Sequence, residues 1–392
     1  MKNCALVLGG YINGLSIIRE LYDNKVKDIW LFDTKKSIAT KSNKISDYKI
    51  IGSSSSSLLE NIKILKNENE YDRIVIYPTG DNHLEQLLEI FEEINRFCFV
   101  PFNEANLVRS LNKYYQYQVC KELSIPFPQT LEIKSKTDVD ELNQLKFPIL
   151  IKPSTRNDIG TDVFRSVFIS GPSELSEARE KIVTHLSQGV EFIASEYIPG
   201  DDSNIYAYTA YRSKKGVILN EWVGKKLTQY PNLFGVFSSA ANSAPNVVAT
   251  QGRLLLDKMN IHGIAEPEFK YDSRDETFKL TEINLRSMMW HRLGTLSGVN
   301  LQLTQWNDAL GYKNVQYIQN LTDRIHFIYF KHEILNLISR KHYWSNFTYN
   351  LFGGKINCFA VFMLSDLKPF LFDSIATIKS IISRCLAKLN GN

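Results

Sequence analysis

Four polar residues in the second half of the chain have the types and spacing of a metal and phosphate site. Glu282, Asn284 and Arg286 alternate along one short run, so their side chains share a face if the run is a strand. Glu268 lies on the preceding apolar run. Mg²⁺ takes one or two carboxylates together with phosphate oxygens, and an arginine neutralises phosphate charge as it moves. The same alternation also suits the solvated face of a surface hairpin, so both interpretations stay open at this point.

The element that must position these residues is an antiparallel hairpin. Residues 265–271 and 278–284 each alternate apolar and polar side chains, and the polar turn 272–276 joins them. Pairing of the two runs predicts that Glu268 lies beside Glu282 and Asn284. Oxygen ligands from two neighbouring strands would then converge on one point.

The first hundred residues alternate between strands and helices. Apolar runs at residues 4–8, 29–32 and 73–77 are followed by helical patterns, which predicts a parallel sheet with right-handed crossovers. The glycine turn at residues 9–14, with Asp33 after the second strand, also suits a nicotinamide-binding site. Its spacing is not G-x-G-x-x-G and it lacks the lysine of a P-loop, so this interpretation is the weaker alternative.

Two lysines lie on a predicted helix and at the end of a predicted strand, positions from which their ammonium groups could bind phosphates. Lys113 lies in a helix predicted over residues 106–123, and Lys152 closes the apolar strand 147–153. A polar turn at residues 154–160 follows the second lysine. A lysine at the end of a buried strand needs a partner, or else it extends its ammonium to solvent as an ordinary surface residue.

Composition bounds the class of protein. The chain has 392 residues, which exceeds a single typical domain. Its net charge of +4 comes from mixed signs without a block of like charges, so we expect no nucleic-acid partner. Five cysteines without C-x-x-C spacing favour reduced thiols in a cytoplasmic protein. No apolar run reaches the roughly 18 residues of a membrane span, and the start leads into a strand and not a signal sequence.

These residues occur in a fixed order: helix lysine, strand lysine, a strand that ends in Glu196 before a Pro-Gly turn, and the acidic hairpin. The order ends in the motifs T-E-I-N-L-R and G-V-N-L. With these motifs the sequence resembles the ATP-grasp superfamily of carboxylate–amine ligases, and within it the branch of D-aspartate ligase-like and carbamoyl-phosphate synthetase-like enzymes. The resemblance runs from residue 1 to about 312. One position departs from it, because Leu285 stands where the family usually has proline; its side chain should point away from the metal.

The resemblance implies an α/β protein with the ATP-grasp fold. Such a protein has an N-terminal parallel-sheet domain, a small middle lobe and a C-terminal lobe built on an antiparallel sheet. The corresponding boundaries are 1–104 for the Rossmann-like pre-ATP-grasp domain, 105–200 for the lysine-bearing small lobe, 201–312 for the metal-binding lobe, and 313–392 for a C-terminal extension.

The resemblance also implies roles for single residues that bind the nucleotide. Lys113 and Lys152 match the lysines that hold the phosphates of ATP. The adenine and ribose contacts fall on Glu196, on the backbone of Tyr197 and Ile198, and on either Asp202 or Asn204.

At the reaction centre, the resemblance assigns Glu268, Glu282 and Asn284 to Mg²⁺, with Mn²⁺ as a substitute, and Arg286 to the phosphorylated intermediate. Lys226 matches a substrate-side loop and either meets a carboxylate or belongs to an ordinary surface Lys-Lys pair.

His291, in the segment after Arg286, either faces substrate as a base or carboxylate binder or has a structural role.

The reaction implied is amide formation through an acyl phosphate, with ADP as product and a small-molecule or glycan carboxylate and an amine as substrates. D-aspartate addition to a peptidoglycan precursor and amino-acid addition to a uronic-acid polysaccharide are both open. Two other classes stay as alternatives: a non-catalytic nucleotide-binding module and a nicotinamide-dependent oxidoreductase.

The end of the chain carries an amphipathic pattern. Residues 370–389 place apolar side chains on one helical stripe and basic residues elsewhere. This helix would pack on the body of the protein, pair with a second copy in a homodimer, or rest on a membrane surface that carries lipid-linked substrates.

Overall fold

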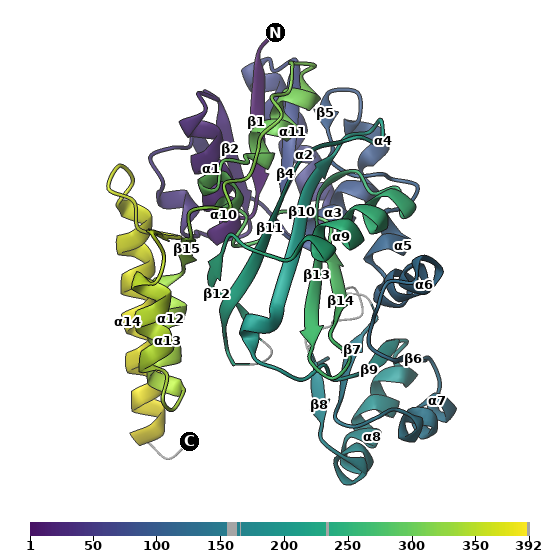
Figure 1. Cartoon of the computed structure of the whole chain (residues 1–392). Coiled ribbons are helices and arrows are strands. Elements are labelled where there is room, and N and C mark those ends of the chain that lie inside the picture. Colours follow the sequence, from purple (N-terminus) through teal and green to yellow (C-terminus); the bar gives the residue numbers. More distant parts are fainter. Residues whose placement is uncertain (155–162, 165, 233–234, 390–392) are drawn as a thin grey trace.

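The computed structural model describes residues 1–154, 163–164, 166–232 and 235–389, without the side chains of 380–381 and 383–389. Three β-sheets, here called A, B and C, follow one another along the sequence (Figure 1). Sheet A is parallel, sheet B is antiparallel, and sheet C is antiparallel except at one edge. The expected α/β fold class is therefore confirmed. The turn expected at residues 154–160 lies outside the described residues apart from Ser154.

Sheet A has the strand order β3-β2-β1-β4-β5. Its strands are β1 (Asn3–Leu8), β2 (Ile29–Asp33), β3 (Asp47–Ile50), β4 (Arg73–Pro78) and β5 (Cys98–Phe99). The helical segments between them are α1 (Ile12–Asp23), η1 (Ala39–Lys41), α2 (Ser55–Asn69), α3 (Asp81–Glu89) and α4 (Phe91–Ile94). The central strand β1 is a continuous apolar run because helices cover both of its faces. The strand order reverses between β1 and β4, where ligands commonly bind in such sheets.

Sheet B has the order β6-β9-β7-β8 and forms a small lobe. Its elements are β6 (Thr130–Ile133), α7 (Lys136–Glu141), η2 (Leu142–Gln144), β7 (Ile149–Pro153), β8 (Val167–Ile169), α8 (Pro172–Ser187) and β9 (Phe192–Glu196). Ile151, Ile182 and Phe192 belong to a hydrophobic core that, among the described residues, is confined to this lobe. The small lobe is therefore a packing unit of its own.

Sheet C is the largest sheet and has the order β14-β13-β10-β11-β12-β15-β16. Its strands are β10 (Ile205–Arg212), β11 (Ile218–Tyr230), β12 (Val236–Ala241), β13 (Gly263–Asp272), β14 (Thr277–Asn284), β15 (Ile325–Ile328) and β16 (Ile356–Phe359). The last two strands come from the C-terminal extension, so the extension continues the sheet that carries the acidic hairpin.

The remaining helical segments either precede sheet B or belong to the second half of the chain. They are α5 (Leu107–Leu111), α6 (Lys113–Leu123), η3 (Asp202–Asn204), α9 (Asn246–Lys258), α10 (Arg292–Leu296), α11 (Leu301–Ala309), α12 (Phe330–Ser339), α13 (Trp344–Phe352) and α14 (Lys368–Leu389). Within the described part of the chain, no helix is both long and apolar enough to cross a membrane.

The single helix predicted over residues 106–123 is wrong, because the structure has two helices there. Asn112 is extended between α5 and α6, and its side chain accepts a hydrogen bond of 2.9 Å from the N–H of Tyr115. Asparagine is favoured at such a cap because it satisfies one of the free N–H groups of the first turn. The break makes Lys113 the first residue of α6.

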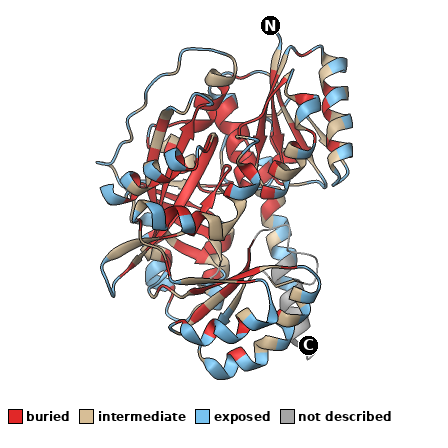
Figure 2. Cartoon of the chain, turned by 90° about the vertical axis from the view of Figure 1, so that its right-hand side faces the viewer, coloured by how far each residue is buried: buried red, intermediate tan, exposed pale blue. Residues whose placement is uncertain are grey.

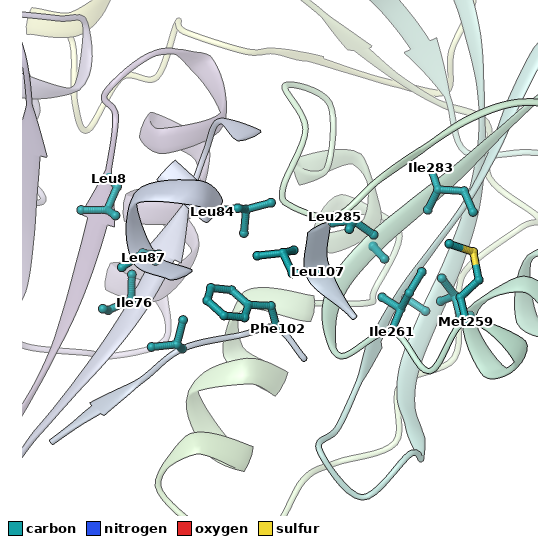
Figure 3. Close-up of a cluster of buried hydrophobic side chains, with 14 of the residues drawn as sticks. Leu8, Ile76, Leu84, Leu87, Phe102, Leu107, Met259, Ile261, Ile283 and Leu285 are labelled. Carbon is teal, nitrogen blue, oxygen red and sulfur yellow. The ribbon is translucent and has the colours of Figure 1, made fainter. Parts of the chain in front are cut away.

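A shared core fixes sheet A against the acidic hairpin. Figure 3 shows Leu84 of α3 and Leu107 of α5 on one side and Leu285 and Ile283 from the end of the hairpin on the other. Each fully buried aliphatic side chain of this kind contributes about 1.5–3 kcal/mol relative to an exposed one. In Figure 2 the buried residues likewise concentrate along the strands of the large sheets. The hairpin is thus held in a fixed position relative to the N-terminal domain.

We expect one buried acid to make the stability depend on pH. Burial raises the pKa of Glu20 in α1 from 4.5 to about 7, although Arg292 nearby opposes this shift. The folded chain therefore binds a proton that the unfolded chain releases, and stability falls as the pH rises between these two values, by at most ~3 kcal/mol. Glu20→Gln should be more stable than the native protein at pH 8 and little different near pH 4.

Thermal unfolding midpoints at both pH values measure this effect. The exposed Glu60 of α2 offers a matched control, because Glu60→Gln should leave the pH dependence unchanged. An equal difference between Glu20→Gln and the native protein at both pH values would contradict the assignment.

Candidate active site

The predicted hairpin is confirmed. β13 and β14 pair antiparallel, with Glu268 opposite Glu282 and Glu266 opposite Asn284. Asp272 still belongs to β13, so the connection is one residue shorter than the polar turn expected from the sequence. These two cross-strand pairs place four side chains that carry oxygen atoms, Glu266, Glu268, Glu282 and Asn284, on neighbouring strands.

The hairpin concentrates negative charge in a buried place. Glu266 and Glu268 are both buried, and burial together with the charges of Glu282 and Glu266 raises the pKa of Glu268. Lys226 of β11 reaches across the sheet and pairs with Glu268, which partly opposes this effect. Burial lowers the pKa of Lys226, but the charge and hydrogen bond of Glu268, together with the charges of Glu266 and Glu282, raise it by more, so the pKa is raised overall. One ammonium therefore faces several carboxylates, an arrangement that favours a further cation.

The donor set suits Mg²⁺ bound together with phosphates. Glu268 and Glu282 offer carboxylates and Asn284 an amide oxygen, which are hard ligands of the kind that Mg²⁺ takes. Among the described residues, no three His, Cys, Asp or Glu side chains are grouped so that they could hold a metal ion by themselves. Such a site needs further oxygen ligands, and the phosphates of a nucleotide are the usual source.

The structure brings Lys113 to the same place. The Lys113 ammonium lies 3.4 Å from the carbonyl oxygen of Pro153, the residue that follows Lys152 at the end of β7. Lys113 begins α6, whose Tyr117 and Val119 belong to the core shared by sheet A and the hairpin, whereas Lys152 ends β7 of the small lobe. The expected range 105–200 therefore joins a helix of the body to the small lobe. A pocket opens beside Lys113, and its lining residues are Asp81, Glu85, Leu111, Lys113, Gln116, Glu282, Ile283 and Asn284. Cationic and anionic groups of the body thus line one pocket, close to the end of the small-lobe strand β7.

Helix α6 holds the edge strand β14 in place. The amide of Gln116 donates to the carbonyl of Ile283 at 3.3 Å and accepts from its N–H at 2.9 Å. The hydroxyl of Tyr117 donates to the carbonyl of Thr281 at 2.8 Å. These bonds satisfy backbone groups of an edge strand that otherwise lack partners, and they fix the residues on either side of Glu282. The sequence gave no signal for Gln116, because its role depends on packing between distant elements.

Arg286 forms an ion pair that the sequence analysis missed. Its Nε donates to Oδ1 of Asp81 at 2.6 Å, and both residues are buried. Asp81 follows the carboxyl end of β4, which is the position where parallel sheets commonly bind ligands. That rule could have singled out Asp81. The ion pair links the N-terminal domain directly to the reaction centre expected at Arg286.

The residues expected to contact adenine lie at the exit of β9. The N–H of Tyr197 donates to the carbonyl of Pro148 at 2.8 Å, so it is engaged within the small lobe. The carboxylate of Glu196 accepts from the N–H of Lys146 at 3.1 Å. Ile198 follows and is buried. This segment joins sheet B to sheet C, as a hinge between two lobes would.

The two candidates for the ribose lie in the next turn. Asp202 is buried and accepts from the N–H of Gln229 at 3.0 Å and from Arg340 at 2.8 Å. Asn204 ends the same short η3 turn. The bonds of Asp202 tie this turn to the C-terminal extension.

Lys270 also belongs to this surface and was missed. It shares the face of Glu268 two positions further along β13, and its ammonium lies 4.6 Å from the ring centre of Tyr197. Burial lowers the pKa of Lys270 to about 8, against the opposing charge of Asp202. Its same-face spacing in E-F-K was the signal that could have identified it.

His291 is paired with the buried hairpin acid. Its Nε2 lies 2.7 Å from Glu266 Oε2, and both side chains are almost fully buried. The ring also packs edge-on against Trp222, with 5.9 Å between centres. In this arrangement the histidine orients Glu266 beside Asn284.

The sequence of the chain has a relative of known activity. No known family profile matches the chain. The chain is 25% identical over 316 residues to the D-aspartate ligase of Enterococcus faecium (strain Aus0004), which covers 76% of this chain and 74% of that protein.

Many solved structures share the fold. The ADP complex of N5-carboxyaminoimidazole ribonucleotide synthetase matches 86% of this chain and 84% of its own, with a TM-score of 0.66 and 14% identity. The L-amino acid ligase from Bacillus licheniformis matches 81% of this chain and 75% of its own, with a TM-score of 0.60 and 15% identity.

The fold is therefore the ATP-grasp fold, with its sheet-A domain, small lobe and larger antiparallel lobe. The sequence match and the structural matches agree: the chain is similar in sequence to a D-aspartate ligase and shares its fold with an N5-carboxyaminoimidazole ribonucleotide synthetase and an L-amino acid ligase.

We expect Glu282→Gln to reduce turnover by two orders of magnitude or more, because the change removes one carboxylate charge from a site for a doubly charged ion. The same variant should need more Mg²⁺ for half-maximal binding of ATP, measured by calorimetry over a series of Mg²⁺ concentrations. The exposed Glu276 in the hairpin turn provides a matched control, since Glu276→Gln should leave both quantities unchanged. A fully active Glu282→Gln enzyme would exclude this metal site.

Proposed function

We propose that the chain is an ADP-forming ligase that joins a carboxylate to an amine through an acyl phosphate. The observation that carries the proposal is one pocket lined by Lys113, Glu282 and Asn284, beside the buried Arg286. The site holds cations for phosphates and oxygen ligands for a metal, which are the parts that phosphoryl transfer requires.

The proposed sequence of events follows from the chemistry of a carboxylate. A carboxylate is a poor electrophile, so its oxygen first attacks the γ-phosphorus of ATP, and the bond to the β-phosphate oxygen breaks to release ADP. The neutral amine then attacks the acyl carbon, phosphate leaves, and the amine nitrogen loses a proton. Most of the rate enhancement would come from positioning and from neutralisation of charge.

Single residues have distinct tasks in this proposal. Lys113 and Lys152 hold the nucleotide phosphates, each as a point charge. Arg286 neutralises the transferring group, and Asp81 keeps its guanidinium in place. Mg²⁺, when bound by Glu268, Glu282 and Asn284, supplies further neutralisation of phosphate charge, and Mn²⁺ suits the same oxygen donors.

On the nucleotide side, we propose that Glu196, with the backbone of Tyr197 and Ile198, meets the adenine, and that Asp202 or Asn204 meets the ribose.

The substrate side of the site is proposed to lie around Lys226. Its buried ammonium stands beside Glu268 and is suited to hold a substrate carboxylate. The similarity to a D-aspartate ligase supports an amino acid as one substrate and a peptidoglycan or other surface-glycan precursor as the other. The non-catalytic module is the remaining alternative, and the intact set of lysines and metal ligands argues against it.

We expect ADP and phosphate to appear in equal amounts with the amide when a matching acid and amine are supplied with Mg-ATP. The measurement resolves nucleotide products for a panel of uronic acids and glycan precursors crossed with free amino acids. Hydroxylamine in place of the amine should yield a hydroxamate, because it traps an activated acyl group. AMP with pyrophosphate would overturn the acyl-phosphate route. Binding of Mg-ATP without ADP or hydroxamate for any acid would favour the binding module.

We further propose that helix α14 rests on an anionic membrane surface. Leu371, Ile375, Ile378 and Ile382 recur at intervals of four and three residues and are 52–56% exposed. A stripe of this kind on a helix needs an apolar partner.

The charges on α14 favour an anionic surface over a second copy of the chain. From residue 374 to the end, the sequence has Lys379, Arg384 and Lys388 but no Asp or Glu. Two such helices would bring like charges together without acidic partners, whereas an anionic bilayer supplies the opposite charge. This contact would place the enzyme near lipid-linked substrates.

We expect the protein to sediment with phosphatidylglycerol vesicles at low salt and not with phosphatidylcholine vesicles, because both the stripe and the basic residues contribute. Ile378→Asp should weaken this binding about tenfold or more, since it places a charge on the apolar stripe. Val108→Asp, at an exposed apolar residue of α5, is the matched control and should bind like the native protein. Failure to bind anionic vesicles, or a dimer in solution that Ile378→Asp dissociates, would overturn the proposal.

A further inference from the structure

The C-terminal extension contacts the strand that carries Lys226. Strand β15 pairs with β12, and helix α12 then lies across β11 and β12. Side chains from α12 and from Arg340 directly after it reach Thr228 and Gln229, which are two and three residues beyond Lys226. The extension thus directly contacts β11, the strand that carries Lys226 at the expected reaction centre.

Glu333 of α12 is the centre of this contact. It is completely buried. Its donors are the Thr228 hydroxyl at 2.8 Å, the Ser238 hydroxyl at 2.6 Å, the Ser239 hydroxyl at 2.8 Å, the Tyr343 hydroxyl at 2.9 Å and the Asn350 amide at 3.2 Å. A buried carboxylate is costly unless donors surround it, so the cluster can form only when β11, β12, α12 and α13 are in register.

Gln229 is the junction between the extension and the nucleotide side. Its carbonyl accepts from Asn336 at 3.0 Å and from Arg340. Its N–H and side-chain amide donate to Asp202 at 3.0 and 3.1 Å, and Arg340 also donates to Asp202 at 2.8 Å. The Gln229 Oε1 lies 3.5 Å from the Lys226 ammonium. One residue therefore joins α12, Asp202 and Lys226.

The backbone of β11 is irregular at this point. Its register with β12 shifts between Lys226 and Thr228 and again between Thr228 and Gln229. An irregular strand has fewer ladder bonds to define its course, and bulges change the direction of the side chains. The hydrogen bonds from Glu333, Asn336 and Arg340 to Thr228 and Gln229 hold this irregular part of β11 in place. With the strand held in this way, Lys226 pairs with Glu268 on β13, two strands away.

We propose that Glu333 and Arg340 are positioning residues for the ATP site. Through Thr228 and Gln229 they fix Lys226 beside the metal ligand Glu268, and through Asp202 they fix the turn expected at the ribose. The C-terminal extension is accordingly a working part of the nucleotide site and not an appended domain. The inference rests on the proposed function for the identity of the nucleotide.

Arg340→Met tests this inference. Because the variant loses a charged hydrogen bond to Asp202 and the bond to Gln229, we expect the Kd for Mg-ATP to rise about tenfold. The KM for Mg-ATP should rise with it, while the thermal midpoint changes by only a few degrees. Arg340→Lys should restore part of the affinity, since it keeps the charge. Glu333→Gln should also raise the Kd for Mg-ATP. Its amide NH₂ group is a donor and would replace one of the two oxygens that accept hydrogen bonds from the surrounding hydroxyl and amide groups.

The chain offers a matched control on the same strand. Arg253 of α9 pairs with Glu221 of β11 at 2.8 Å, on the part of the strand remote from Lys226. Arg253→Met should leave the Kd for Mg-ATP unchanged. The native protein is titrated with Mg-ATP first: no binding there would refute the proposed function itself. Native binding together with equal Kd values for Arg340→Met and Arg253→Met would overturn the positioning role alone.

Discussion

The site depends on a concentration of negative charge that the fold buries. Glu266 and Glu268 lie on one face of β13, opposite Asn284 and Glu282 on the next strand. Like charges on neighbouring strands repel in a medium of low polarity, so the arrangement persists only with cations, protons or hydrogen-bond donors beside it. Lys226 and His291 fill that role toward Glu268 and Glu266. The attraction of such a site for a metal–nucleotide complex has the same origin.

The scaffold restricts how this charge can relax. Strand β14 is the edge of sheet C, yet Gln116 and Tyr117 of α6 bond its backbone on both sides of Glu282. The apolar core that joins sheet A to the hairpin packs directly behind, around Leu285 (Figure 3). The carboxylates therefore cannot move apart to reduce their repulsion, which favours a proton or a cation beside them.

The two lysines expected at the phosphates belong to separate packing units. Lys113 starts a helix of the body, whereas Lys152 ends a strand of the small lobe, whose core is its own in the described part of the chain. A nucleotide held by both would bridge the lobes. On the opposite side, the extension adds β15 and β16 to sheet C and bonds Asp202 through Arg340. The residues of the candidate site accordingly come from, or are bonded by, three parts of the chain that are distant in sequence.

Local pattern was sufficient for much of this protein. The alternation in residues 265–284 determined the hairpin and hence the pairing of Glu268 with Glu282, because side-chain direction in a strand follows from spacing alone. The alternating strands and helices of the first hundred residues likewise determined the parallel sheet.

Local pattern failed at residue 112, where an asparagine cap ended one helix and began another. The tertiary structure alone decided the partners of Arg286, Lys226 and Asp202, since Asp81, Glu268 and Arg340 are 205, 42 and 138 residues away from them. Such pairings depend on how sheets and helices pack in space, and no spacing within a single element records that.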